Sequence, residues 1–75
     1  MKRVVNDLLY DTETSDLIYI EVDTQRKLYR TTKGRFFTFY KNGEIIPKSE
    51  EDTKDYLGRV DVEKYIEVFG QPEKA

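Results

Sequence analysis

Residues 27–47 read KLYRTTKGRFFTFYKNGEIIP and contain three runs of strand-forming residues separated by two turn signals. The runs are residues 27–32, 35–41 and 44–47. Lys33-Gly34 separates the first two, and glycine readily takes the left-handed backbone of a tight turn. Asn42-Gly43 is the strongest hairpin dipeptide in the chain. Pro47 has no amide to donate, so the last strand ends there or lies at a sheet edge. The pattern predicts an antiparallel meander.

Upstream of this region, three further strand signals are separated by two polar turns. Asn6 and Asp7 both tolerate positive φ, so they predict a two-residue hairpin turn between residues 2–5 and 8–10. Residues 11–16 are rich in side chains that bond their own backbone, which indicates a turn or one short helical turn. Residues 17–22 alternate, which predicts a strand with Ile18, Ile20 and Val22 on one face and Leu17, Tyr19 and Glu21 on the other.

After Pro47 the pattern becomes helical. Ser49 is a helix N-cap followed by acidic residues, and Gly58 is placed to end that helix. Only Thr53, Tyr56 and Leu57 of this helix are spaced to face a core. A second helix begins at the N-cap Asp61 and ends before Gly70. Its apolar face is expected to be Val62, Tyr65, Ile66 and Phe69.

The whole pattern predicts an α+β fold, with an antiparallel β-meander of about four to five short strands and two short C-terminal α-helices. We expect one small domain over residues 1–70 and a frayed tail over residues 71–75. The chain has 75 residues, and a domain of this size buries only about 60% of the surface that its unfolded form exposes. The core is therefore expected to be small.

Composition excludes several kinds of chemistry. The chain has no Cys and no His, so disulfides, thiolate nucleophiles, imidazole bases and zinc sites built on those ligands are ruled out. No Walker loop, dinucleotide fingerprint or nucleophile elbow is present. We therefore predict a protein that is not an enzyme, with no catalytic residue and no cofactor. No apolar run approaches the roughly 20 residues of a membrane span, and the start lacks a signal peptide, so we expect a cytoplasmic protein with no membrane partner.

The net charge of −2 hides three opposed blocks. Residues 24–48 carry seven bases and one acid, whereas residues 1–23 and 49–75 each carry a net charge of −4. Either the basic strands pair with the acidic segments inside the fold, or the basic block presents a local field to a partner. The first acids of the helix that follows Ser49 form a second, acidic patch; they are Glu50, Glu51, Asp52 and Asp55.

Aromatic residues interleave with this basic block. If Phe37 and Phe39 face the core, Phe36 and Tyr40 point to the other face, so this strand is either covered on both faces or presents an aromatic surface. Exposed Tyr and Arg are enriched in protein interfaces and also stack on nucleic-acid bases. The candidate interaction surface is Tyr19, Arg26, Lys27, Tyr29, Arg30, Lys33, Arg35, Phe36, Tyr40 and Lys41.

Two motif matches are too incomplete to predict a site. Residues 33–40 match an RNA-recognition strand motif at Lys33, Gly34, Phe37 and Tyr40, but the helix that this fold needs between its first two strands is missing. Residues 11–16 imitate the opening of a calcium-binding loop, but position six is Asp16 instead of Gly and position twelve is Val22 instead of Glu. No metal site is therefore predicted.

Several segments resemble a group of small uncharacterised bacterial proteins that phages and mobile elements carry. The resemblance lies in residues 6–14 with the signature Y-D-T-E-T, 28–37 with L-Y-R-T-x-x-G-x-F-F, 46–51 with P-x-S-E-E, and 65–70. The chain departs from the group at Asp7, where the group has Gly, and in a shorter connection between the strand after Gly34 and the helices. The resemblance implies a phage or mobile-element context inside a bacterial host cell, and it transfers no catalytic residue.

Three functions are compatible with these features. The first is a protein-binding module that inhibits or modulates a bacterial host factor by surface occlusion, as an anti-CRISPR or other anti-defence protein. The second is a nucleic-acid-binding accessory protein that uses the basic and aromatic hairpin 26–41, although its acidic flanks would repel phosphate. The third is a homo-oligomeric structural or regulatory protein, such as a homodimer paired through an edge strand.

Overall fold

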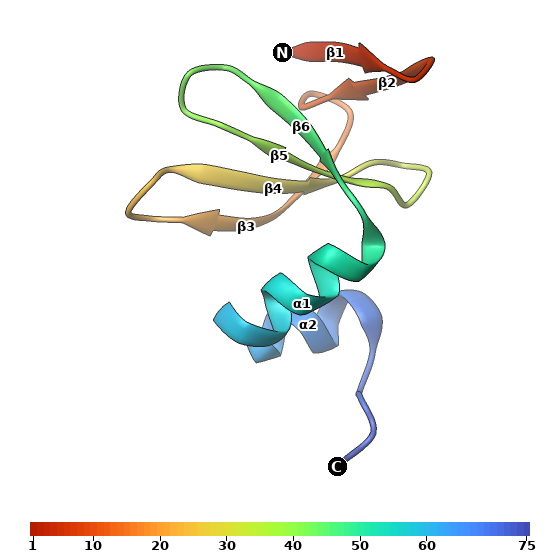
Figure 1. Ribbon diagram of the computed structural model, residues 1–75, viewed down its shortest axis with the longest axis vertical. Coiled ribbons are helices and arrows are strands. Elements are labelled where there is room, and N and C mark those ends of the chain that lie inside the picture. Colours follow the sequence, from red (N-terminus) through yellow and green to blue (C-terminus); the bar gives the residue numbers. More distant parts are fainter.

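Four strands that follow one another along the chain form the central sheet (Figure 1). They are β3 (Asp16–Glu21), β4 (Arg26–Arg30), β5 (Phe36–Phe39) and β6 (Ile45–Lys48). Each pairs with the next in antiparallel order, which confirms the meander. The computed structural model describes residues 1–75, and its six strands and two helices make an α+β fold. Pro47 lies in the edge strand β6, where a missing amide donor is tolerated.

Glycines with positive φ make both turns of the meander after β4. Gly34 has a φ of +86°, as the turn prediction required. The loop is longer than the predicted two-residue turn, because β4 ends at Arg30 and β5 begins only at Phe36. Between β5 and β6, Gly43 has a φ of +90° and donates its amide to the Tyr40 carbonyl at 2.8 Å. The Asn42-Gly43 turn is confirmed.

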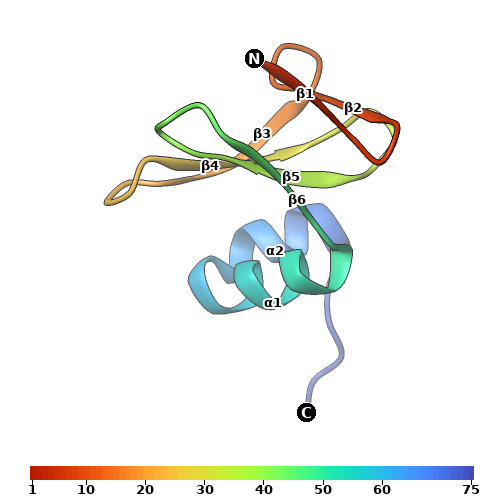
Figure 2. The ribbon, with the colours of Figure 1, turned by 45° about the horizontal axis from the view of Figure 1, so that its top comes forward.

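A separate hairpin precedes the central sheet. It consists of β1 (Lys2–Val5) and β2 (Leu8–Asp11), which pair antiparallel. Asn6 has a φ of 51° and Asp7 a φ of 64°, so two left-handed residues make the turn, and the predicted two-residue hairpin is confirmed. Figure 2 shows this hairpin on one side of the central sheet and both helices on the other. We call these two sides the hairpin side and the helix side.

The two helices follow β6 without a long linker. They are α1 (Glu50–Val60) and α2 (Val62–Phe69). Both predicted N-caps are confirmed, since the Ser49 Oγ accepts from the Asp52 amide and the Asp61 Oδ1 accepts from the Lys64 amide, each at 3.0 Å. The prediction that Gly58 ends α1 is wrong. The helix continues to Val60 because Asp61 provides the cap at this junction, so Gly58 lies inside α1. Gly70 follows the end of α2, as predicted.

A bulge in β3 changes which residues share a face. Leu17 pairs with Tyr29, but Tyr19 pairs with Leu28, so Ile18 is the extra residue. Ile18 and Tyr19 therefore both pack against the helix-side core, and the prediction that Ile18 shares a face with Ile20 and Val22 is wrong. Leu17 lies with Ile20 on the hairpin side, and both are about half exposed, so the prediction that Leu17 shares a face with Tyr19 and Glu21 is also wrong. Val22 follows the end of the strand and is 81% exposed.

The core consists of two small clusters, one on each side of β5. Phe37 packs with Tyr10 and Ile45 on the hairpin side. Phe36 packs with Leu28 and Leu57 on the helix side. These six residues are all buried, so β5 is covered on both faces.

Helix α2 covers the helix-side cluster with a face that differs from the predicted one. Tyr65 and Phe69 pack there as expected, but Val68 joins them and Val62 is 55% exposed. The residues of α2 that contact the cluster are therefore Tyr65, Val68 and Phe69, in the second half of the helix. The prediction that Val62 belongs to the contact face is wrong. In α1, the predicted core-facing residues are confirmed, with Thr53 and Leu57 fully buried and Tyr56 half-buried.

Candidate functional site

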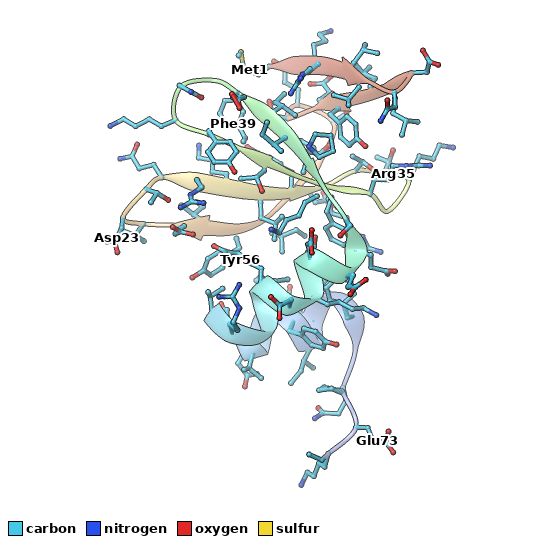
Figure 3. All side chains as sticks on the ribbon, in the orientation of Figure 1. Met1, Asp23, Arg35, Phe39, Tyr56 and Glu73 are labelled. Carbon is cyan, nitrogen blue, oxygen red and sulfur yellow. The ribbon has the colours of Figure 1, made fainter.

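Polar and aromatic side chains gather on the helix side, where the end of the sheet meets α1. Three are tyrosines and three are charged; we call them the tyrosine cluster, and they are Tyr19, Glu21, Arg26, Tyr40, Lys48 and Tyr56. All six line one small pocket. Register explains most of this placement, since Glu21 pairs with Arg26 across β3 and β4. In Figure 3, Tyr56 extends from α1 toward the sheet.

Glu21 is the centre of the hydrogen bonds in this cluster. The Tyr56 hydroxyl donates to Oε2 of Glu21 at 2.6 Å, and the Thr24 hydroxyl donates to Oε1 at 2.9 Å. The Arg26 guanidinium lies 3.5 Å from Oε1. The hydrogen bond from Tyr56, then that from Thr24 and the charge of Arg26, hold the pKa of Glu21 below its ordinary value, although burial opposes them. Glu21 is therefore an ionised acceptor with its oxygens already engaged.

Tyr56 is held as a neutral donor. Burial raises the pKa of Tyr56 well above its ordinary value, and the neighbouring Glu21 carboxylate raises it further. An ionised glutamate with a lowered pKa is a poor base, and a tyrosine with a raised pKa is a poor acid. The hydrogen bond between them joins β3 to α1.

Cations and rings order the rest of the cluster. The Arg26 guanidinium lies over the Tyr40 ring, 5.7 Å from its centroid, and the Lys48 ammonium lies 5.1 Å from the Tyr56 centroid. Tyr19 and Tyr56 meet edge to face with centroids 6.0 Å apart. Each of the three tyrosines is half-buried.

The pocket within the cluster is small. Its volume is about 80 Å³. Sites that enclose a small organic molecule usually measure about 300–1,000 Å³. The cluster is therefore suited to contact with a surface rather than to enclosure of a substrate.

The structure divides the candidate surface predicted from the sequence. It brings Tyr19, Arg26 and Tyr40 together, but Phe36 is only 3% exposed and is packed under the helices, so its inclusion was wrong. Tyr29 stacks on Phe37 on the hairpin side, with centroids 5.1 Å apart. Lys27 also lines the pocket of the cluster and borders a hollow on the hairpin side. The remaining cations lie elsewhere: Arg30 over the Phe36 ring, Lys33 and Arg35 in the β4–β5 loop, and Lys41 in the β5–β6 loop.

Three members of the tyrosine cluster were missing from the sequence prediction. Alternation in β3 already placed Glu21 on the same face as Tyr19, and the helical spacing of α1 already turned Tyr56 inward. No local pattern predicts the hydrogen bond between Glu21 and Tyr56, because these residues are 35 positions apart. Lys48 joins them because it ends β6 beside the start of α1.

The predicted acidic patch is exposed along α1. Glu50, Glu51 and Asp52 lie in the first helical turn, where the helix dipole favours negative charge, and Asp55 forms an ion pair with Arg59 at 3.4 Å. No group of three or more carboxylates is arranged to hold a metal ion. Asp11, in the calcium-loop-like segment, accepts instead from the Glu13 amide at 3.0 Å.

No family model, curated protein or solved structure matches this chain. Neither α1 nor α2 is long and apolar enough to cross a membrane.

Proposed function

We propose that this protein is a small protein-binding module without enzymatic activity, and that the tyrosine cluster is its contact surface. The observation that carries the proposal is the set of three half-buried tyrosines held beside Arg26 and Lys48 around a pocket of about 80 Å³. Tyr and Arg are the residues most enriched in interface hot spots. The pocket is small compared with substrate sites, which favours contact with a protein surface.

The internal bonds of the cluster favour tight contact. A side chain that becomes ordered only on binding costs about 0.5–1.5 kcal/mol of affinity. Here Tyr56 is already fixed by Glu21 and Tyr40 by Arg26, so less freedom remains to be lost. The exposed acids at the start of α1 add a second patch of opposite charge, which would select a partner with a mixed surface.

We further propose that the partner is a bacterial host factor and that the protein inhibits or modulates it in the host cytoplasm by covering a functional surface. The support is the resemblance to small proteins of phages and mobile elements. Anti-CRISPR or other anti-defence activity fits a chain of 75 residues, because occlusion needs only a stable contact surface.

Nucleic-acid binding has less support than protein binding. A phosphate backbone is best matched by a continuous track of cations. In this fold the cations of residues 26–41 are divided between two faces and two loops, and Arg26 is already paired with Glu21.

The decisive experiment is capture of a partner from bacterial lysate by immobilised wild type and by Tyr40→Ala and Arg26→Ala, together with a defence-interference assay in cells. We expect a stoichiometric protein partner, bound at least tenfold more weakly by each variant, as for loss of a hot spot. Lys33→Ala, in the exposed β4–β5 loop, is the control and should bind normally. Thermal melts establish that each variant is folded.

Two results would contradict the proposal. One is the absence of any stoichiometric partner combined with no effect on a defence system. The other is a complex with nucleic acid whose affinity falls log-linearly with salt concentration, because that dependence indicates phosphate contacts.

A further inference from the structure

The two edge strands of the central sheet, β6 and β3, differ in how well they are protected from pairing with another strand. At one edge, β6 contains Pro47, and the Arg3 guanidinium donates to the Ile45 carbonyl from the neighbouring β1. At the other edge, no strand pairs with the outer side of β3 (Figure 1). Open edges leave backbone N–H and C=O groups that can pair with another chain, and proline blocks such pairing. The β3 edge is therefore the one available to a further strand.

The sheet surface beside β3 is also uncovered on the hairpin side. The β1–β2 hairpin packs on Phe37 and Ile45, over the β5–β6 half of the sheet. Leu17 remains 47% exposed and Ile20 45% exposed, on the face where that hairpin does not reach. Ile20 and Val22 border a shallow hollow with Phe39. An added strand could bury apolar side chains there while its backbone pairs with β3.

Charge determines what kind of strand fits. Residues 11–23 contain five acids and no base. Asp16 begins β3, and Asp23 lies in the turn after it, where Figure 3 shows it at the end of the molecule. In antiparallel pairing with a second copy, the acidic ends would face each other, and like charges in opposed positions are unfavourable. A segment with basic residues at both ends would instead be attracted.

We propose that β3 accepts an extended segment of the protein partner as a fifth strand, and that this segment alternates apolar residues between basic ends. The proposal rests on the proposed function and identifies the recognition mode of that partner. Main-chain hydrogen bonds supply the pairing, and the exposed Leu17, Ile20 and Val22 select apolar side chains on the hairpin side. The bulge at Ile18 disturbs the start of β3, so the ladder is expected from Tyr19 onward.

An NMR titration of the ¹⁵N-labelled full chain with synthetic peptides tests this proposal. The probe is the blocked peptide Lys-Val-Thr-Val-Thr-Val-Lys. One control has glutamate at both ends, and another is N-methylated on the amides of the pairing edge. We expect the lysine-ended peptide to shift and protect amides within residues 16–22, and both controls to bind at least several-fold more weakly.

Matched variants locate the contact. Ile20→Thr and Asp23→Asn should each lower the affinity of the lysine-ended peptide about two- to fivefold, the size expected of one exposed contact. Val4→Thr and Asp7→Asn make comparable changes on the β1–β2 hairpin, a β-branched apolar residue to Thr and a carboxylate to an amide, and should leave the affinity unchanged. Raising the salt concentration should weaken wild type more than Asp23→Asn.

Several outcomes would overturn the proposal: no binding at millimolar peptide, equal binding of the N-methylated peptide, or shifts confined to β6 or to the members of the tyrosine cluster outside β3. A dimer of the protein alone that pairs through β3 would also overturn it, because the occupant would then be a second copy. The titration needs no host factor, so its failure is distinct from failure of the Tyr40→Ala capture experiment.

Discussion

At the scale of single residues, the hydrogen bond from the Tyr56 hydroxyl to the Glu21 carboxylate links two segments that are far apart in sequence. It joins β3 to α1 over 35 positions of sequence at 2.6 Å. Hydrogen bonds to charged groups contribute more than neutral ones, and this one is partly buried. It therefore holds the tyrosine cluster together and contributes to the docking of the helix.

The Glu21–Tyr56 hydrogen bond also makes the free energy of unfolding depend on pH. Because the pKa of Glu21 is lowered in the folded protein, its stabilisation is complete above the ordinary value of 4.5 and is lost as the pH falls through the lowered pKa. We expect Tyr56→Phe to lower the free energy of unfolding by about 1 kcal/mol at neutral pH and by less in acid. Urea unfolding of both proteins from pH 7 down to pH 2.5 measures this difference.

Tyr65→Phe is the matched control for Tyr56→Phe, since Tyr65 is also half-buried and packs on the same core but forms no such bond. Its stability should stay parallel to that of wild type across the pH range. A pH-independent difference between Tyr56→Phe and wild type would show that the loss comes from packing and not from the charge of Glu21.

At the scale of elements, side chains cap the starts of both helices, and glycine ends only α2. Asp61 caps the end of α1 through its amide, which donates to the Leu57 carbonyl, and starts α2 through its carboxylate. Gly58 is consequently left inside a helix, where glycine costs about 1 kcal/mol relative to alanine. In contrast, Gly34 occupies a left-handed turn that alanine adopts only with strain.

We expect opposite effects from the same substitution at these two glycines. Gly58→Ala should raise the free energy of unfolding by about 0.5–1 kcal/mol, because a Cβ there would lie 3.9 Å from the nearest atom, on Tyr65, which is ordinary contact. Gly34→Ala should lower it by about 1 kcal/mol, because of the positive φ and despite open space around the site. Thermal melts of the three proteins measure both changes, and a destabilised Gly58→Ala would contradict the continuous helix.

At the scale of the whole molecule, β5 joins two thin cores into one. Phe36 and Phe37 are neighbours in sequence, yet they belong to clusters on opposite sides of the sheet. Each cluster has only three buried residues, so neither is large enough to stand alone. The hairpin and the helices therefore stabilise the same sheet from its two sides.

Truncations test this dependence. Removal of residues 71–75, which are exposed and have no regular structure, should change the free energy of unfolding by less than about 0.5 kcal/mol. A chain that ends at Asp61 loses the side chains of α2 that cover Phe36, and each buried apolar side chain contributes roughly 1.5–3 kcal/mol. We expect this chain to lose cooperative urea unfolding and near-ultraviolet circular dichroism. A cooperative transition at an unchanged midpoint would contradict the shared core.

Local chemistry was sufficient to predict the order of strands and helices. Each turn and each helix N-cap depends on only a few adjacent residues, so a single sequence is enough to predict it. The turns are those at Asn6-Asp7, Gly34 and Gly43, and the caps are Ser49 and Asp61. Of the ten residues in the predicted surface, Tyr19, Arg26, Lys27 and Tyr40 line one pocket in the structure, whereas Phe36 is buried and Tyr29 lies on the other side of the sheet.

Tertiary packing decided the rest. Whether Phe36 was surface or core depended on the helices that cover it, and the bulge put Leu17 and Ile18 on the faces opposite to those predicted. The joining of Glu21 to Tyr56 and the exposure of the β3 edge depend equally on segments that are distant in sequence. Periodicity gives the direction of a side chain relative to its own strand or helix, but only the docking of separate elements determines what covers it.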